Sequence, residues 1–258
     1  SGMTWFDAVT HAMSSCSTCG FSTKNASVAF WDSPAIEGII MGAMTVSAIH
    51  FGILYATITG RRNNIFRSEV VRTFIGMMLV ITIVIAFSLW SGDIYPTLGE
   101  SFRHSAFQVV SITTTTGFAT ADTNLWTPLA IALLVLCSVI SGCAGSTSGG
   151  MKVDRVLIAT KVIRQRMKLQ LHPNAVIRIK VDGLVQDERV QSLVMTFIVT
   201  YMIFVLLGTV VYTLFGCDLT TSFTASIACI SNVGPGFGEV GSMSNFSDLP
   251  AILKLTST

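Results

Sequence analysis

Three short polar stretches carry residue types that could coordinate a dehydrated cation. They are Ser17-Thr18-Cys19-Gly20-Phe21, Thr114-Thr115-Thr116-Gly117-Phe118 and Ser231-Asn232-Val233-Gly234-Pro235. In each, a hydroxyl residue stands three positions before a glycine, and the glycines recur roughly every 100 residues, which indicates an internal repeat. Carbonyl and hydroxyl oxygens can replace an ion's hydration shell. Glycine permits the backbone conformations and the close approach that such a site needs.

The composition is that of an integral membrane protein. Hydrophobic residues make up 51% of the chain, charged residues only 12%, and the mean hydropathy is +0.66. An ordinary soluble domain is about a quarter charged. The net charge of +2 is too small to indicate a nucleic-acid partner. The chain starts directly before a short helix and stops inside an apolar run, so we expect a fragment of a longer protein.

Each polar stretch follows a segment that is too short to cross a bilayer. Residues 4–15, 100–111 and 219–230 each predict a helix of about 12 residues, or about 18 Å, against a hydrocarbon core of about 30 Å. Non-helical backbone at membrane depth survives only where it lines water or is buried in protein. We therefore interpret the three stretches as pore loops that line one ion pathway.

Longer apolar segments separate these units. Residues 38–59, 73–90 and 190–217 each predict a membrane-spanning helix, and two further spans begin at residues 125 and 249. The predicted fold class is an all-α membrane protein with repeated units of membrane helix, pore loop and membrane helix around one central ion pore. We expect residues 1–60, 61–168 and 189–258 to form three repeats and residues 169–188 to form a cytoplasmic linker.

The span that begins at residue 125 is interrupted by a run of small residues. Its members are Gly142, Cys143, Ala144, Gly145, Ser146, Thr147, Ser148, Gly149 and Gly150. Each glycine inside a helix costs roughly 1 kcal/mol relative to alanine, so the helix should break here. The glycine spacing resembles a phosphate-binding loop, but Met151 stands where that motif needs lysine. A plain packing break and a flexible gate beneath the pore loops remain, and the mid-membrane position favours the gate.

The basic residues predict the orientation. Thirteen of the 16 lie in residues 61–72 and 152–189, which the positive-inside rule places in the cytoplasm. The pore loops then enter from the outside, where acidic residues such as Asp32, Asp93 and Asp122 would attract cations. A short helix entering from that side points its negative C-terminal end towards the membrane centre. No carboxylate lies within the loops, which favours a monovalent ion such as potassium.

Other groups have competing interpretations. Cys16 and Cys19 form a C-x-x-C pattern that could be redox-active or bind metal, but no second pair accompanies it, so no transition-metal site is expected. His50 is a functional candidate because it is ionisable within a predicted span. The alternative is a neutral histidine bonded between packed helices. We expect Glu37 to lie at the membrane interface.

These repeats resemble the Trk/Ktr/HKT superfamily of potassium transporters. Residues 142–150 with Lys152 after them, and the motif His172-Pro173-Asn174-Ala175-Val176, are most similar to the bacterial TrkH/TrkG branch. Asn232-Val233-Gly234-Pro235-Gly236 resembles the fourth pore loop of that branch. The resemblance covers essentially the whole chain. It implies four repeats around one pore, and the loops found here would be those of the second, third and fourth.

The resemblance also implies a set of site residues and partners. Its potassium-coordinating positions fall on Thr18, Cys19, Gly20, Thr115, Thr116, Gly117, Asn232, Val233 and Gly234, largely through backbone carbonyls. Cys19 departs from the commoner small or hydroxyl residue, which is tolerable if only its carbonyl matters. The gating loop falls on residues 142–150. The implied protein is a homodimer in the bacterial cytoplasmic (inner) membrane, works with a cytoplasmic nucleotide-binding regulatory ring of the TrkA kind, and needs no cofactor.

The expected function is potassium uptake through a filter of backbone carbonyls. Superfamily members with serine in place of a filter glycine are often sodium-permeable, and all three loops here keep glycine. The alternatives are a sodium-permeable or mixed monovalent-cation transporter, a redox membrane enzyme that uses Cys16 and Cys19, and a scaffold protein with vestigial loops. In the favoured interpretation the chain is not an enzyme.

Overall fold

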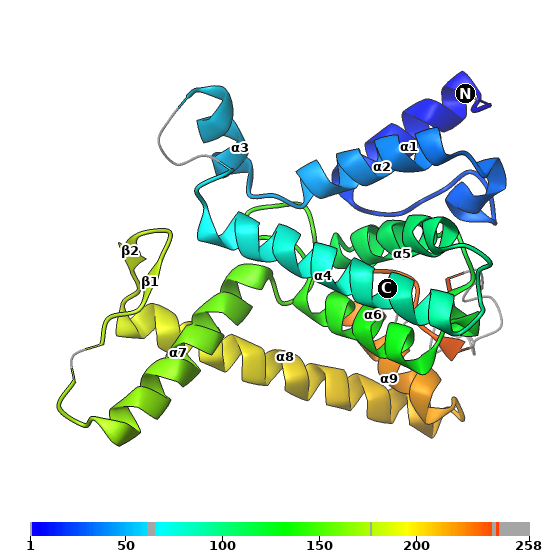
Figure 1. The fold of residues 1–258 in the computed structure, drawn as a ribbon. Coiled ribbons are helices and arrows are strands. Elements are labelled where there is room, and N and C mark those ends of the chain that lie inside the picture. Colours follow the sequence, from blue (N-terminus) through cyan, green and yellow to red (C-terminus); the bar gives the residue numbers. More distant parts are fainter. Residues whose placement is uncertain (1, 61–64, 176, 239–240, 243–258) are drawn as a thin grey trace.

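The computed structural model describes residues 2–60, 65–175, 177–238 and 241–242. It is built almost entirely of helices (Figure 1), as the predicted fold class requires. The helices are α1 (Trp5–Ser17), α2 (Pro34–Ser47), α3 (Phe51–Ile58), α4 (Glu69–Ser91), α5 (Leu98–Thr113), α6 (Pro128–Ile140), α7 (Val153–Leu171), α8 (Glu188–Leu214) and α9 (Leu219–Ile230). Strands β1 (Lys180–Val181) and β2 (Leu184–Val185) form a hairpin, and single 3₁₀ turns occupy Ser27–Trp31 and Thr123–Leu125.

Within the described ranges, two helices are long and apolar enough to cross a membrane alone. They are α4, with 23 residues, and α8, with 27. Both leave large apolar side chains exposed along their length, including Ile83 and Phe87 on α4 and Ile203 and Leu207 on α8. Such surfaces suit contact with lipid. These helices lie where spans were predicted at residues 73–90 and 190–217, whereas the span expected from residue 249 lies outside the described residues.

The three short helices form as predicted, each from a side-chain cap. The side chains of Thr4, Thr97 and Asp218 accept hydrogen bonds from backbone N–H groups in the first turns of α1, α5 and α9. These helices have 13, 16 and 12 residues. At 1.5 Å per residue even α5 is only about 24 Å long, less than the bilayer core. All three are therefore too short to cross a bilayer.

The span predicted over residues 38–59 is not one continuous helix. The chain instead forms α2 and α3, which are bent by 100° at a break after Ser47. The glycine-rich run of residues 142–150 enters this break, because Cys143 N donates to Ala48 O (3.0 Å) and Phe51 N donates to Gly145 O (3.1 Å). His50 Nδ1 accepts from Gly52 N at 2.8 Å and caps α3. The free backbone groups of both helix ends are thereby satisfied.

The break predicted within the next apolar segment is present. Helix α6 ends at Ile140 and α7 begins at Val153, and the small residues between them form a loop. The side chain of Ser141, which has a φ of 57°, accepts from Lys152 N at 3.2 Å and donates to Gly149 O at 2.8 Å. These bonds close the loop at its base. The two breaks, after Ser47 and after Ile140, therefore meet each other inside the protein.

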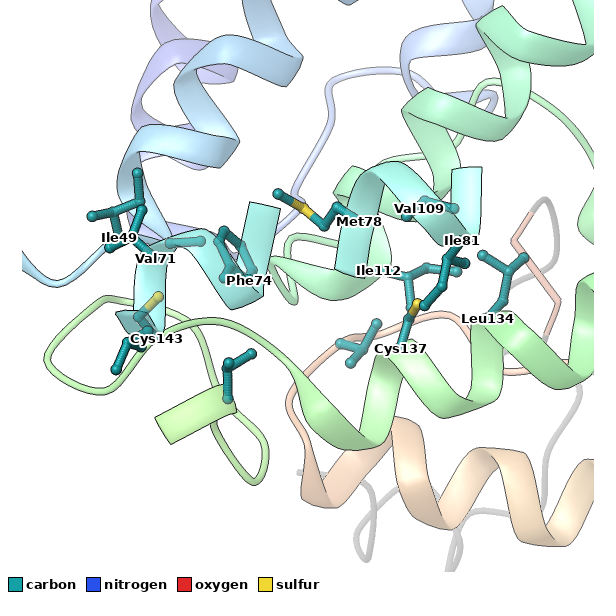
Figure 2. Close-up of a cluster of buried hydrophobic side chains, with 14 of the residues drawn as sticks. Ile49, Val71, Phe74, Met78, Ile81, Val109, Ile112, Leu134, Cys137 and Cys143 are labelled. Atoms are coloured by element: carbon teal, nitrogen blue, oxygen red, sulfur yellow. The ribbon is translucent and has the colours of Figure 1, made fainter. Parts of the chain in front are cut away.

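The apolar core surrounds α4. Figure 2 shows Ile81 of α4 beside Val109 and Ile112 of α5 with Leu134 of α6 nearby, and Ile49 and Cys143 near Val71, where the two broken segments meet. Phe74 and Met78 of α4 belong to the same buried cluster. Phe74 and Leu134 are fully buried. Burial of a large apolar side chain contributes about 1.5–3 kcal/mol, so this core holds the short helix α5 firmly in place.

The predicted polar linker, residues 169–188, contains structure that was not predicted. Its first residues extend α7, and its last ones form the β1–β2 hairpin. Asp182 and Gly183 occupy the turn with positive φ values of 50° and 81°, which suits a tight hairpin turn. Asp182 accepts hydrogen bonds from Ser68 Oγ (2.8 Å) and from Glu69 N at the start of α4. The division into repeats with the stated bounds stays a prediction.

Candidate functional site

The three polar stretches have the same backbone geometry. We call residues 17–21, 114–118 and 231–235 the first, second and third loop. The residue two positions before each glycine is left-handed, with φ values of 51° at Thr18, 56° at Thr115 and 56° at Asn232. The glycines are left-handed too, with φ values of 70°, 82° and 97°. The intervening residue donates its N–H to the carbonyl five residues earlier in every loop, at 3.1, 2.9 and 2.9 Å.

The loops converge on one another. A Cβ atom at Gly20 would overlap the carbonyl oxygen of Thr116, and one at Gly117 would overlap the carbonyl oxygen of Val233. Glycine is therefore required at both positions by contact as well as by φ. A cavity of about 370 Å³ opens between the loops and the segments after them. All three loops line it, through Cys19, Gly20, Phe21, Thr116, Gly117, Val233, Gly234 and Pro235.

The loop carbonyls are not engaged by the protein. Across the part of the chain that the structure describes, no donor reaches the carbonyl oxygens of the two residues before each glycine. These residues are Thr18, Cys19, Thr115, Thr116, Asn232 and Val233. Cys19, Thr116 and Val233, one residue from each loop, line the cavity. Their unengaged carbonyls form a set of oxygen ligands that suits a cation.

The loop hydroxyls bond to the protein. Ser17 Oγ donates to Met13 O at 2.8 Å, the hydroxyls of Thr114 and Thr116 lie 2.8 Å apart, and Ser231 Oγ lies 2.7 Å from the Tyr201 hydroxyl. The hydroxyls named at the start as possible ion ligands thus form hydrogen bonds within the protein. The side chains position the loops, and the backbone oxygens are left for other partners.

The glycine-rich loop, residues 142–150, contacts the second and third loops and the residue just before the first. Thr147 Oγ1 donates to Cys16 O (3.3 Å), just before the first loop, and Gly149 N donates to Thr115 Oγ1 (2.8 Å) in the second. A Cβ at Gly149 would overlap the carbonyl oxygen of Ser231 in the third. The glycine-rich loop thus lies directly against the site, on the side of α7.

A second set of contacts ties the glycine-rich loop to the helices around it. Asp154 accepts from Ala144 N at 2.5 Å, and the ammonium group of Lys152 donates to Ser148 O. Gly145 lies against the ring of His50, where a Cβ would come within 2.8 Å. His50 therefore acts as a helix cap and a packing partner of this loop. This role is closer to that of a histidine bonded between packed helices than to that of a functional group in the ion path. Sequence reasoning did not anticipate the contact because its partners come from distant segments.

Glu37, which was expected at the membrane interface, is buried inside the protein. The residue is only 1% exposed, and both carboxylate oxygens accept from Arg103, at 2.8 and 2.7 Å. Arg103 also contacts Asp32 at 2.7 Å. A bidentate pair of this kind is strong and directional. It joins α2, beside the first loop, to α5, which leads into the second.

Three further contacts fix the outer side of the site. Asp7 accepts from Thr23 Oγ1 at 2.6 Å and from Thr4 Oγ1 at 2.8 Å, and these bonds, the one from Thr23 foremost, lower the pKa of its carboxyl group. Asn124 exchanges two hydrogen bonds with the backbone of Gly238, at 2.9 and 3.0 Å. Asp7 thus holds the chain after the first loop, and Asn124 joins the chain after the second loop to the chain after the third. The sequence motifs did not indicate either residue.

The C-x-x-C pattern does not build a metal centre in the described part of the chain. Cys16 and Cys19 are exposed free thiols, and no cluster of three or more His, Cys, Asp or Glu side chains suited to a metal occurs among the described residues. Cys19 Sγ lies 3.1 Å from Ser17 Oγ and 3.5 Å from Ser14 Oγ. The residue behaves as a part of the first loop.

These features define a helical membrane protein with re-entrant loops that converge on one site. The TrkH model, described as a cation transport protein, matches residues 2–257, and the chain belongs to this family. Its members are integral proteins of the bacterial inner membrane and are transport proteins, not enzymes. The all-α membrane fold is thereby confirmed, and the redox-enzyme alternative has no support.

Several relatives cover nearly the whole chain. The Trk system potassium uptake protein TrkH of Salmonella typhimurium is 36% identical over 255 residues, 98% of this chain and 52% of that protein. TrkG of Escherichia coli is 34% identical over 93% of this chain and 50% of its own length. The crystal structure of the potassium transporter TrkH from Vibrio parahaemolyticus superposes with a TM-score of 0.89 at 34% identity, covering 96% of this chain and 53% of that one. The chain spans about half the length of these relatives.

Proposed function

We propose that the protein takes up potassium through a filter built from the backbone carbonyls of the three loops. The carrying observation is that Cys19, Thr116 and Val233, one residue from each loop, line a shared cavity of about 370 Å³ and that no donor among the described residues reaches their carbonyl oxygens. The C-terminal ends of α1, α5 and α9 lead directly into these loops. Their negative dipole ends favour a cation at the same place.

The filter proposed here is open on one side. Gly20 and Gly117 each face a carbonyl of the next loop, but a Cβ at Gly234 would meet no atom of the described residues within 4 Å. We propose that a fourth loop, from a part of the protein beyond these residues, stands against Gly234 in the same way. This agrees with the four-repeat arrangement that the family resemblance implies.

We further propose that residues 142–150 gate the path. The glycine-rich loop contacts the second and third filter loops and Cys16, just before the first, so a movement of this loop would uncover the filter from the side of α7. A homodimer and a cytoplasmic nucleotide-binding ring that moves this gate are proposed from the family resemblance.

A sodium-permeable or mixed monovalent-cation transporter is the second candidate. The glycines at positions 20, 117 and 234 favour potassium, because a serine at any of them would add a hydroxyl beside the ion and strain the backbone. The loop proposed to stand against Gly234 would influence this choice.

The test is potassium uptake by the full-length protein in cells that lack their own potassium uptake, with sodium as competitor. The key variant is Gly234→Ser, because its φ of 97° is strained for serine while a Cβ would clash with none of the residues that the structure describes. Gly183→Ser is the matched control, since it has a φ of 81° and open space in the β1–β2 turn. We expect selectivity for potassium to fall several-fold in Gly234→Ser alone.

Two results would contradict the proposal. If wild-type protein reaches the membrane but moves neither ion, even with its regulatory partner present, the proposed transport function is wrong. If Gly234→Ser transports ions with unchanged ion preference, the third loop is not part of the filter. Equal uptake of sodium and potassium by the wild type would favour the second candidate.

A further inference from the structure

A basic groove lies at the far end of α7 from the filter. It runs between the C-terminal half of α7 and the segment that leads into β1, with a volume of about 220 Å³. Its lining residues are mostly cationic: Lys161, Arg164, Gln165, Lys168, Ile177, Arg178, Ile179 and Lys180. Figure 1 shows the end of α7 and the hairpin projecting from the helical bundle. The groove is therefore separate from the ion path.

The groove is held in shape by bonds across it. Gln165 Nε2 donates to Ile177 O at 2.5 Å, and Lys161 Nζ donates to Lys180 O at 2.7 Å. Lys161 also pairs with Glu69 of α4 at 2.6 Å. These contacts fix the segment before β1 against α7, so the two walls are in place before anything binds.

The other four cations have no protein counter-ion. Among the described residues, no carboxylate lies within ion-pair distance of Arg164, Lys168, Arg178 or Lys180. Like charges that line one groove repel one another unless an anion joins them. Arginine and lysine together suit phosphate, since arginine offers a planar pair of donors and lysine a compact charge.

The surroundings of the groove are those of a membrane surface. Ile163, Met167 and Leu171 follow one another along the adjoining face of α7 and are 51%, 60% and 77% exposed. A helix with neighbouring basic and apolar faces is typical of the bilayer interface. By the positive-inside rule this end of α7 is cytoplasmic, where anionic lipid headgroups attract basic segments.

We propose that this groove is a binding site for a phosphate group. The group belongs either to the headgroup of an anionic phospholipid of the inner leaflet or to a soluble polyphosphate. Both present the same chemistry to Arg164, Lys168 and Arg178. In either case the ligand would fix α7, which continues directly from the glycine-rich loop, relative to the hairpin that is docked on α4.

The experiment compares two charge-removed variants of the full-length protein in detergent. The groove variant is R164Q/K168Q/R178Q. The matched control is R72Q/R166Q/R189Q, which removes three exposed basic residues that do not line the groove. Bound dioleoylphosphatidylglycerol and dioleoylphosphatidylcholine are counted by native mass spectrometry. Inorganic pyrophosphate serves as the soluble probe, with binding measured by a thermal shift in lipid-stripped protein.

We expect wild type and control to bind at least one of the two phosphate probes, and the groove variant to bind it about tenfold more weakly. Loss of phosphatidylglycerol alone identifies a lipid site, and loss of pyrophosphate alone identifies a soluble ligand. Phosphatidylcholine binding should not distinguish the three proteins. Equal affinities of wild type and groove variant, equal losses in groove variant and control, or no binding of either probe to wild type would each overturn the proposal.

Discussion

Thr18 and Thr115 hold left-handed backbone conformations that β-branched residues normally avoid. Such a residue costs roughly 1–3 kcal/mol unless its surroundings compensate for the strain. At Thr115 the compensation is visible, because its hydroxyl accepts a hydrogen bond from Gly149 N and its side chain is only 1% exposed. The strained residue therefore connects the proposed filter to the proposed gate.

This contact predicts the effect of Thr115→Val, which keeps the shape and the backbone strain but removes the acceptor. Gly149 N then lacks its partner, at a cost of about 1–2 kcal/mol. We expect lower thermal stability and a several-fold higher basal ion flux, measured in proteoliposomes without any regulatory partner. Thr73→Val on the exposed face of α4 is the control. Basal flux equal to wild type would show that this bond does not hold the gate closed.

At the scale of helices, much of the arrangement could be predicted from the sequence. The three short helices, the spans at α4 and α8 and the break after Ile140 follow from length, hydropathy and glycine content. The break after Ser47 could not be predicted in this way, because the residues that stabilise it are distant in the sequence. Cys143 and Gly145 form hydrogen bonds with the backbone groups at the break, and nothing in the sequence of residues 38–59 indicates these partners.

The contact between the two breaks predicts the behaviour of Gly145→Ala. The added Cβ would strain a φ of 72° and press on the His50 ring at 2.8 Å. We expect displacement of the glycine-rich loop and raised basal flux. Combining it with His50→Ser should partly reverse the effect, since serine removes the ring and can still cap α3. Fluxes that simply add in the double variant would exclude a direct contact between these residues.

The β1–β2 hairpin connects separate elements, because Asp182 docks it on the start of α4. The Asp-Gly pair between short apolar runs is typical of a hairpin turn, so the hairpin could have been predicted from the sequence. We expect Asp182→Gly, which keeps the left-handed turn but removes the carboxylate, to lower the free energy of unfolding by about 1–2 kcal/mol. Asp187→Gly is the control, since the Asp187 side chain makes no capping bond to α8. Equal midpoints in thermal unfolding for the two variants would argue against docking.

At the scale of the whole molecule, the residues of the candidate site could be predicted from the sequence. The contacts that hold these residues in position could not. The hydroxyl and glycine pattern identified the three loops, and the structure brings them together. The bonds that set their mutual distances come from residues outside every motif, such as Tyr201, Asn124 and Arg103. Polar residues of this kind are common on protein surfaces, so their types alone do not mark them.

We expect loss of the Arg103–Glu37 pair to affect both the stability of the protein and its ion selectivity. In Arg103→Gln, Glu37 stays buried without its counter-charge, which we expect to cost roughly 2–3 kcal/mol after allowing for the partial exposure of Arg103. Since the pair joins α2 to α5, the first and second loops should also lose their spacing, and selectivity for potassium should fall. The double variant Arg103→Gln/Glu37→Gln removes the buried charge and should recover most of the stability, as measured by thermal unfolding. A single variant as stable and as selective as the wild type would mean that other contacts set the distance between these loops.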